Sequence, residues 1–337
     1  MRKIAAIALS LFLWTGLASA GTFGHDRHHL HPQPAKKGHM IARFGIITDI
    51  HYTNKADSTS RKYSAGLAKT EYFVDVMNRE NADFVIELGD FVDTLADDKD
   101  PIVNLSEIES VFTRFEGPQY HVLGNHDFDN MSRADLLPRL ENTGIPTGKT
   151  YYSFDSNDIH CIVLDADYTV AEPHLPFDYP NTFWNWKDAW IPQEELDWLE
   201  NDLADSNLPT IVFTHQLMHR DTTEDHTIKN ADAVMALFEA DGQVLAVFSG
   251  HDHRGEVAFR NGIHYFVLEG NVGMSLDWSE VSPTEGLDPV TDSPFTLVEI
   301  RKLNEVDTFN GLQTYQVKLN GNAQQYTFQD QLIIVEP

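Results

Sequence analysis

Several short segments of this sequence place carboxylate and imidazole side chains directly after runs of apolar residues. Two examples are Asp49 and His51 after residues 44–48, and Gly89-Asp90 after residues 84–88. The others are Gly124-Asn125-His126-Asp127, His215 and Gly250-His251-Asp252-His253. An apolar run that ends in a polar turn is typical of a buried strand, and α/β proteins carry their functional groups at such strand ends. Each segment alone would fit an ordinary polar turn, but their recurrence in one chain favours a shared site.

The side-chain types in these segments indicate a transition-metal site. Histidine nitrogen and carboxylate oxygen together suit Mn, Fe, Zn or Co better than Ca or Mg. The single cysteine, Cys161, lies in an apolar run and is expected to be buried, so a thiolate-bound structural zinc is disfavoured. The segments offer more ligands than one ion needs, which favours two ions that share a carboxylate. Two ions about 3.5–4 Å apart can hold both the attacking and the leaving oxygen of a phosphoryl transfer.

The elements that carry these segments alternate along the first half of the chain. Apolar runs at residues 44–48, 84–88 and 120–123 are separated by helical patterns at 63–77 and 108–115, which predicts a parallel sheet covered by helices. The second half is predicted to contain a hairpin at 151–164, a helix that starts at Pro192, a strand at 210–214, a helix at 231–238 and a strand at 244–249. Alternating runs from about residue 256 onward predict antiparallel strands. Residues 41–337 are expected to form one domain.

Taken in order, Asp-x-His, Gly-Asp, Gly-Asn-His-Asp, a later His and Gly-His-x-His resemble the motifs of the calcineurin-like metallophosphoesterase family. The resemblance implies an α/β fold, namely a four-layer α/β/β/α sandwich of two mixed β-sheets flanked by helices. It assigns one divalent transition-metal ion to Asp49, His51 and His253, a second to Asn125, His215 and His251, and both to a bridging Asp90. It further implies attack by a metal-bridging hydroxide, a catalytic His126 that faces the phosphate, and an Asp127 that orients His126. Asp252 is expected to point away from the ions.

Other parts of the sequence indicate the branch of the family. Purple acid phosphatases have a tyrosine ligand where this chain has Asp93, which disfavours their ferric site. Short strings, among them residues 44–50, 193–199 and 267–270, resemble the manganese-dependent ADP-ribose/CDP-alcohol diphosphatases, so manganese is favoured. Arg61 and Lys62 are then expected to contact a second phosphate or a ribose, although a surface salt bridge fits them equally well. A phosphomonoesterase, a cyclic-nucleotide phosphodiesterase and a non-catalytic secreted metal-binding protein remain alternatives.

The N-terminal segment has the pattern of an export signal. Residues 1–20 combine Arg2 and Lys3, an apolar run and a small-residue cleavage site, while the histidine-rich residues 21–40 are expected to form an unstructured leader. A secreted or periplasmic protein that is free of the membrane after cleavage is therefore expected. The net charge of −28 disfavours binding to nucleic-acid polymers and favours a small phosphorylated substrate. The oligomeric state is left open.

A long segment at residues 166–190 is unusually rich in aromatic side chains. Segments of this length in a compact domain are commonly functional or disordered, and aromatic residues argue against disorder. Two interpretations remain open, because the rings would either pack the segment onto the domain or offer a surface on which a nucleobase stacks.

Overall fold

The computed structural model describes residues 38–58, 61–93, 100–273, 288–306, 313–322 and 331–335. The signal and most of the leader, residues 1–37, lie outside the described residues. The leader had been expected to extend to residue 40, but the first strand already begins at Gly38 and includes His39. This strand is long because it pairs over most of its length with a strand from the far end of the chain. In the described part of the chain no helix is long and apolar enough to cross a membrane.

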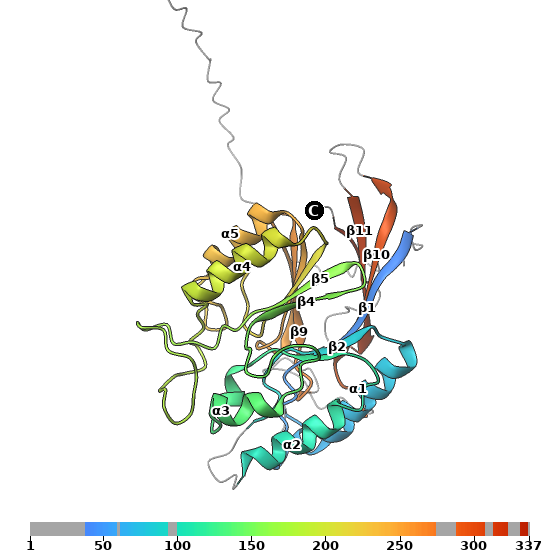
Figure 1. Ribbon diagram of the computed structural model, residues 1–337. Helices are drawn as coiled ribbons and strands as arrows, with labels where there is room; N and C mark the ends of the chain where they lie inside the picture. Colours follow the sequence, from blue (N-terminus) through green and yellow to red (C-terminus); the bar gives the residue numbers. More distant parts are fainter. Residues whose placement is uncertain are drawn as a thin grey trace, which may run out of the picture. The chain divides into compact units, whose positions relative to one another are not determined.

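The fold is built from two mixed β-sheets (Figure 1). The first sheet has the order β12-β11-β10-β1-β2-β3, and the second has the order β4-β5-β6-β7-β9-β8. The strands are β1 (Gly38–Ile47), β2 (Phe84–Glu87), β3 (Gln119–His121), β4 (Tyr152–Ser156), β5 (Ile159–Val163), β6 (Thr210–Phe213), β7 (Val244–Ser249), β8 (Arg254–Arg260), β9 (Ile263–Glu269), β10 (Phe295–Val306), β11 (Gln313–Asn322) and β12 (Gln331–Val335). Each sheet has a parallel part that is extended by antiparallel strands. The expected pair of mixed sheets is confirmed.

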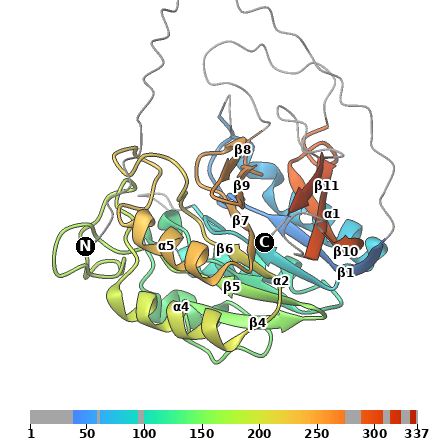
Figure 2. The same cartoon turned by 90° about the horizontal axis from the view of Figure 1, so that it is seen from above.

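Helices cover the outer faces of both sheets (Figure 2). They are η1 (Tyr63–Ala65), α1 (Gly66–Glu80), α2 (Pro101–Phe112), η2 (Asn125–Phe128), α3 (Arg133–Leu136), η3 (Leu137–Arg139), α4 (Gln193–Asp205) and α5 (Ala231–Asp241). Apolar residues of α1 and α2 pack on the first sheet, and those of α4 and α5 pack on the second. A third apolar cluster, drawn from strands of both sheets, fills the space between them. These contacts give the four layers expected from the resemblance.

The residues of β2 show how the sequence builds these layers. All four of its side chains are buried. Phe84 and Ile86 belong to the cluster between the sheets, whereas Val85 belongs to the cluster beneath the helices. Side chains of a strand alternate between its two faces, so a strand covered on both faces must be apolar throughout. A continuous apolar run is therefore the sequence signature of each central strand.

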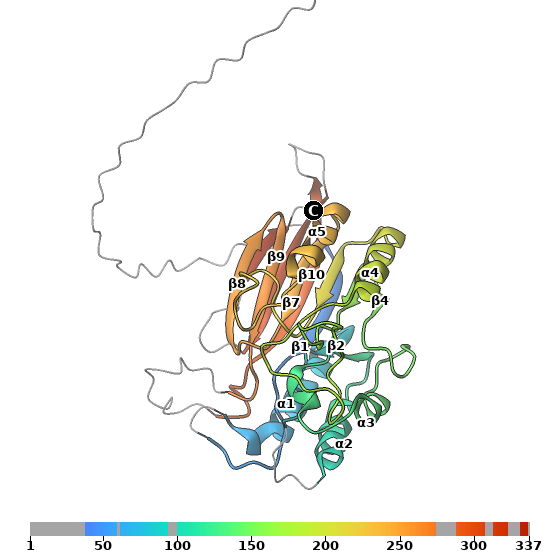
Figure 3. The ribbon, with the colours of Figure 1, turned by 90° about the vertical axis from the view of Figure 1, so that its left-hand side faces the viewer.

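The pairing of the strands after residue 254 differs in one respect from the expectation. β9 pairs antiparallel with β8 but parallel with β7, whereas only antiparallel strands were predicted here. The connection between β8 and β9 is the two-residue turn Asn261-Gly262, in which both residues have positive φ. This tight hairpin pairs β8 with β9, and in the sheet β9 lies beside β7 while β8 is at the edge (Figure 3). Strand alternation does not reveal the partner of a strand, so the sequence could not distinguish these arrangements.

Candidate metal centre

The polar segments predicted from the sequence meet at the carboxyl ends of the parallel strands. These strands are β1, β2 and β3 of the first sheet and β6 and β7 of the second. Backbone hydrogen bonds join neighbouring segments there: Asp49 N donates to Gly89 O at 3.1 Å, and Gly250 N donates to His215 O at 3.1 Å. The backbone N of His251 also donates to the Asp49 carboxylate. The carboxyl ends of both sheets therefore form a single site.

One group of possible ligands contains Asp49, His51, Asp90 and His253, each with a donor atom within 4.8 Å of the others. His253 Nε2 lies 3.0 Å from Asp49 Oδ1, and His51 Nε2 lies 3.5 Å from Asp90 Oδ2. The Nε2 atoms of His51 and His253 are only 3.2 Å apart. A shared cation between these two nitrogens and the carboxylates would bind all of them. This group contains the residues assigned from the sequence to the first ion.

A second group contains Asp90, His215 and His251. His215 Nε2 lies 3.2 Å from Asp90 Oδ2, the same oxygen that faces His51 in the first group. The rings of His215 and His251 have centroids 4.9 Å apart. Asn125, which was assigned to the second ion from the sequence, is fully buried at the start of η2, the turn that follows β3. Asp90 is thus the one carboxylate common to both groups, as a bridging ligand must be.

The buried polar atoms of these residues show that the site fits metal ions. The Nε2 atoms of His215 and His251 and both polar atoms of the Asn125 amide are buried without a hydrogen-bond partner. Leaving a buried polar group unsatisfied costs about 1–3 kcal/mol, so groups of this kind are rare unless a ligand completes them. The donor set of carboxylate, imidazole and amide matches first-row divalent ions. These residues would hold the two ions.

Two imidazoles are oriented by partners on their other ring nitrogen. His215 Nδ1 donates to Leu88 O at 2.7 Å, which leaves Nε2 as the ring nitrogen that faces Asp90. His51 Nδ1 lies 3.5 Å from Asp93 Oδ2, so Nε2 faces the first group. Such partners fix the tautomer and the ring orientation of metal-binding histidines. The position of the missing tyrosine ligand is therefore occupied by a carboxylate that lies beside His51, a contact that the sequence did not reveal.

The electrostatics of the site follow from burial and from the close carboxylates. Burial lowers the pKa of His51 to about 4 and that of His251 well below its usual value, so both are neutral and able to bind a cation near neutral pH. Burial alone would also lower the pKa of His215, but the adjacent Asp90 carboxylate raises it. Burial alone would raise the pKa of Asp49 and Asp90, but the neighbouring histidines hold both pKa values below the usual range. Both carboxylates are therefore ionised.

The backbone of the site adopts unusual conformations. Positive φ angles between 49° and 66° occur at Asp49, His51, Asp90, His251 and His253. Residues with a Cβ rarely adopt this left-handed region, and each instance costs of order 1–3 kcal/mol. Strain of this kind persists only where the surrounding structure enforces it, and it is concentrated at functional sites. Here it turns successive side chains after a strand toward the same space.

Two glycines allow the segments to approach closely. A Cβ on Gly124 would lie 2.1 Å from Asp90 N, and one on Gly250 would lie 2.1 Å from Thr48 Oγ1. Real Cβ atoms essentially never come that close to other heavy atoms. The glycines in the Gly-Asn-His-Asp and Gly-His-Asp-His segments are thus required because any side chain there would push neighbouring segments apart.

His126 and Asp127 differ in their placement. The side chain of His126 is 30% exposed, and its ring centroid is 5.0 Å from that of His51, so it lies beside the first group and is open to solvent. Burial opposes its charged form, but Asp90 and Asp129 raise its pKa to about 9. Its Nδ1 pairs with Asp129 Oδ2 at 2.7 Å. The expectation that Asp127 orients His126 is therefore wrong, and Asp129 makes this contact.

The Asp127 carboxylate is used within its own turn. It accepts hydrogen bonds from Gly124 N at 2.9 Å and from Val92 N at 3.2 Å. The residues Asn125–Phe128 form a 3₁₀ turn, in which side chains three positions apart are aligned. That spacing aligns His126 with Asp129, while Asp127 points back to cap the turn. Asp127 thus holds the turn in place and does not contact the imidazole.

The two basic residues expected to contact substrate lie in different surroundings. Arg61 Nη1 is 3.5 Å from Asp93 Oδ2, next to His51, and Lys55 Nζ is 2.7 Å from Asp93 Oδ1. Lys62 Nζ instead donates to Ser58 O at 3.2 Å. Arg61 therefore lies at the site, and it also forms a salt bridge, which was the alternative to substrate contact. Lys55 is an additional cation at the site that the sequence analysis did not identify.

Asp252 points away from the ions, as expected. Its carboxylate forms an ion pair with Arg220 at 2.5 Å and accepts from Arg254 Nε at 2.6 Å. These pairs fix the turn between the two presumed ligands His251 and His253. Arg220 lies in a segment without a recognisable motif, so its contact with Asp252 could not be predicted from the sequence.

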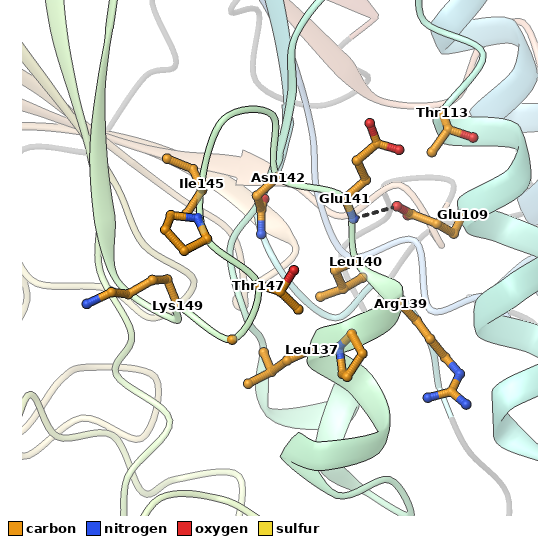
Figure 4. A pocket seen from close by; sticks show the side chains of 13 residues that line it. Glu109, Thr113, Leu137, Arg139, Leu140, Glu141, Asn142, Ile145, Thr147 and Lys149 are labelled. Carbon is orange, nitrogen blue, oxygen red and sulfur yellow. Dashed lines mark hydrogen bonds between the residues drawn. The ribbon is translucent and has the colours of Figure 1, made fainter.

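A separate cavity of about 340 Å³ lies between the end of α2 and residues 137–149 (Figure 4). Its lining includes Glu109, Glu141, Arg139 and Lys149, and the backbone N of Glu141 donates to Glu109 Oε1 at 2.9 Å. None of the metal-site residues lines this cavity. It therefore does not belong to the metal centre.

A two-sheet sandwich with paired ligand groups that share one carboxylate defines a binuclear metal-dependent phosphoester hydrolase. The model of the calcineurin-like phosphoesterase family matches residues 42–255, and the chain belongs to that family. The family assignment, the enzyme class and the divalent transition-metal cofactors expected from the sequence are thereby confirmed.

Individual relatives are similar over most of the chain. A manganese-dependent ADP-ribose/CDP-alcohol diphosphatase from Arabidopsis thaliana is 26% identical over 305 residues, which cover 79% of this chain and 96% of that protein. A protein of the same name from Oryza sativa subsp. japonica is 27% identical over 266 residues, which cover 67% of this chain and 82% of that protein. The crystal structure of a dimetal phosphatase from Danio rerio aligns with a TM-score of 0.66 at 20% identity, covering 88% of this chain and 99% of that one.

Proposed function

We propose that this protein hydrolyses the diphosphate bond of small nucleotide-type substrates, of the ADP-ribose or CDP-alcohol class, with manganese as its preferred metal. The observation that carries the proposal is the pair of ligand groups joined by the Asp90 carboxylate. Relatives that align over most of their length with this chain bear the name of manganese-dependent ADP-ribose/CDP-alcohol diphosphatases, which supports this substrate class. When bound, the ions supply Lewis acidity and lower the pKa of coordinated water.

The residues of the chain have separable tasks in this reaction. Two divalent ions would be held by Asp49, His51, Asn125, His215, His251 and His253, with Asp90 shared between the two ligand groups. His126 is the open imidazole beside the site, and because Asp129 occupies its Nδ1, its Nε2 is the atom that faces the phosphate. Lys55 and Arg61, on the side of His51, provide positive charge for the second phosphate of a diphosphate.

A substrate panel tests the proposal. Purified protein would be assayed with ADP-ribose, CDP-choline, a cyclic nucleotide and a simple monoester, each with Mn²⁺, Zn²⁺ and Fe²⁺. Highest kcat/KM for a diphosphate with Mn²⁺ is expected. Asp90→Ala should abolish turnover, whereas Asp75→Ala, an exposed carboxylate on α1, should not alter it. Preference for the monoester or the cyclic nucleotide would contradict the substrate class, and equal turnover by Asp90→Ala would contradict the metal site.

We also propose that residues 1–20 direct export and are cleaved after Ala20, so that the mature protein is secreted or periplasmic. The charged start, the apolar run and the Ala18-Ser19-Ala20 segment support this. Mass spectrometry of the N-terminus should find Gly21 in the exported fraction. An intact Met1 on protein that remains inside the cell would contradict it.

A further inference from the structure

Most aromatic residues of the segment 166–190 are used for packing. Phe177 is fully buried and stacks on Trp184 at a centroid distance of 4.4 Å. Trp190 stacks on His174 at 4.2 Å, and the Tyr168 ring lies beneath the guanidinium of Arg133 at 5.2 Å. For these rings, the packing interpretation offered by the sequence is sufficient.

Trp186 differs because it reaches the metal centre and remains accessible. It is 40% exposed. Its ring centroid is 5.1 Å from that of His226 and 6.1 Å from that of His251. The interplanar angles are 51° and 57°, so neither imidazole lies flat against the indole. The indole therefore lies next to His251 of the second ligand group without stacking on either imidazole.

The indole has a cation–π contact with Lys187, which also forms an ion pair. The ammonium group of Lys187 lies 5.2 Å from the Trp186 ring centroid and forms a 2.8 Å ion pair with Asp225. This pair ties the segment of Trp186 to the segment of His226 at the edge of the site.

We propose that Trp186, flanked by His226, is the subsite that receives the nucleobase of the substrate. The inference rests on the proposed function, since it requires a nucleotide whose phosphate binds at the metal centre. His251 separates Trp186 from the metal position by one imidazole ring, and in a nucleotide one ribose separates the base from the phosphate. Lys55 and Arg61 lie at His51, in the other ligand group, so a diphosphate chain can extend from the metals toward them.

The proposal predicts a selective loss of base recognition. Stacking of a base on an aromatic side chain contributes about 1–3 kcal/mol, which corresponds to roughly 5- to 150-fold in affinity. Calorimetry on the Mn²⁺-loaded protein would compare AMP with ribose 5-phosphate, which differ only by the base. The wild type should bind AMP at least about fivefold more tightly. Trp186→Ala should bring the two affinities together through weaker AMP binding alone, and Trp186→Phe should retain most of the preference.

Phe183 provides the matched control. It belongs to the same segment and is 99% exposed, and it is not part of the metal centre. Phe183→Ala should leave the affinity ratio unchanged. The subsite proposal is overturned if Trp186→Ala keeps the wild-type ratio, if Phe183→Ala lowers it equally, or if the wild type shows no preference for AMP. Failure of the proposed function has a different signature, namely no Mn²⁺-dependent hydrolysis of ADP-ribose by the wild type.

Discussion

The contact between His126 and Asp129 offers a direct test of which carboxylate supports the open imidazole. Hydrogen bonds to charged groups contribute about 1.5–3 kcal/mol, and partial exposure to water places this one near the lower limit. The side chains of His126 and Asp129 are 30% and 27% exposed. Asp129→Ala should therefore lower kcat/KM about tenfold. His126→Ala should lower it by about 10²- to 10⁴-fold while both metals remain bound.

A double-mutant cycle distinguishes action through His126 from an independent effect. If Asp129 acts only by holding the imidazole, Asp129→Ala should cause no further loss when His126 is already alanine. The assay is kcat/KM for ADP-ribose with Mn²⁺, accompanied by the metal content of each variant. An additional tenfold loss in the double variant would refute the reasoning, and so would a normal rate for Asp129→Ala.

Asp127 serves as the contrasting carboxylate in this experiment. Its side chain accepts two buried backbone N–H groups, so Asp127→Ala should lower the free energy of unfolding by about 1–3 kcal/mol. Asp129→Ala should lower the free energy of unfolding less, because its contact with His126 is partly exposed to water. Chemical denaturation of both variants measures the difference. Equal destabilisation by the two substitutions would contradict the assignment of Asp127 to the turn.

Three further predictions concern the metals and two buried groups. Elemental analysis of Asp90→Ala should find that both metal ions are lost. Chelation of the metals from the wild type should lower its Tm, because a ligand at 100 times its Kd stabilises a protein by about 2.7 kcal/mol. An unchanged Tm after chelation would contradict this prediction. Burial alone would lower the pKa of His160, but hydrogen bonds to Asp202 and a second carboxylate raise it. A pKa of His160 that is higher in the folded than in the unfolded state, where it is about 6.5, stabilises the fold at pH values below about 6.5. This contribution is lost as the pH rises through the folded-state pKa. The decrease in Tm caused by His160→Gln should therefore be larger at pH 5.5 than at pH 9. Lys69→Met should cost about 1–3 kcal/mol in urea denaturation, since the buried ammonium donates to the carbonyls of residues 271 and 272; a neutral result would show that these carbonyls need no donor.

The sequence was sufficient to predict the central strands because each is covered on both faces. Phe84, Val85 and Ile86 must all be apolar when alternate side chains enter different cores. The same logic fails for β9, where burial does not specify whether the neighbour runs parallel or antiparallel. The tight turn after β8 explains the antiparallel pairing of β9 with β8, but it does not determine which of these two strands pairs with β7.

The site was predictable in its ligand types and only partly in its supporting contacts. Residues such as Asp49 and His251 stand directly after apolar runs, so their position at a strand end could be inferred. The contact of Asp129 with His126 could not be inferred from the sequence, because it depends on a 3₁₀ turn. An extended chain would bring other side chains next to His126. Trp186 was one of several aromatic residues in its segment, and only its contacts with His226 and His251 distinguish it.

Several features of the site oppose folding, and metal binding would offset them. Left-handed backbone at residues such as Asp49 and Asp90 and unpartnered buried atoms at Asn125 and His215 each oppose folding. A sequence adopts such features only where other interactions offset them. Apolar packing of both sheets stabilises the scaffold, but it does not satisfy the buried Asn125 and His215 atoms. Ions bound at Asp90 would satisfy them and would neutralise the carboxylates, so the metals are expected to complete the structure as well as to activate the substrate.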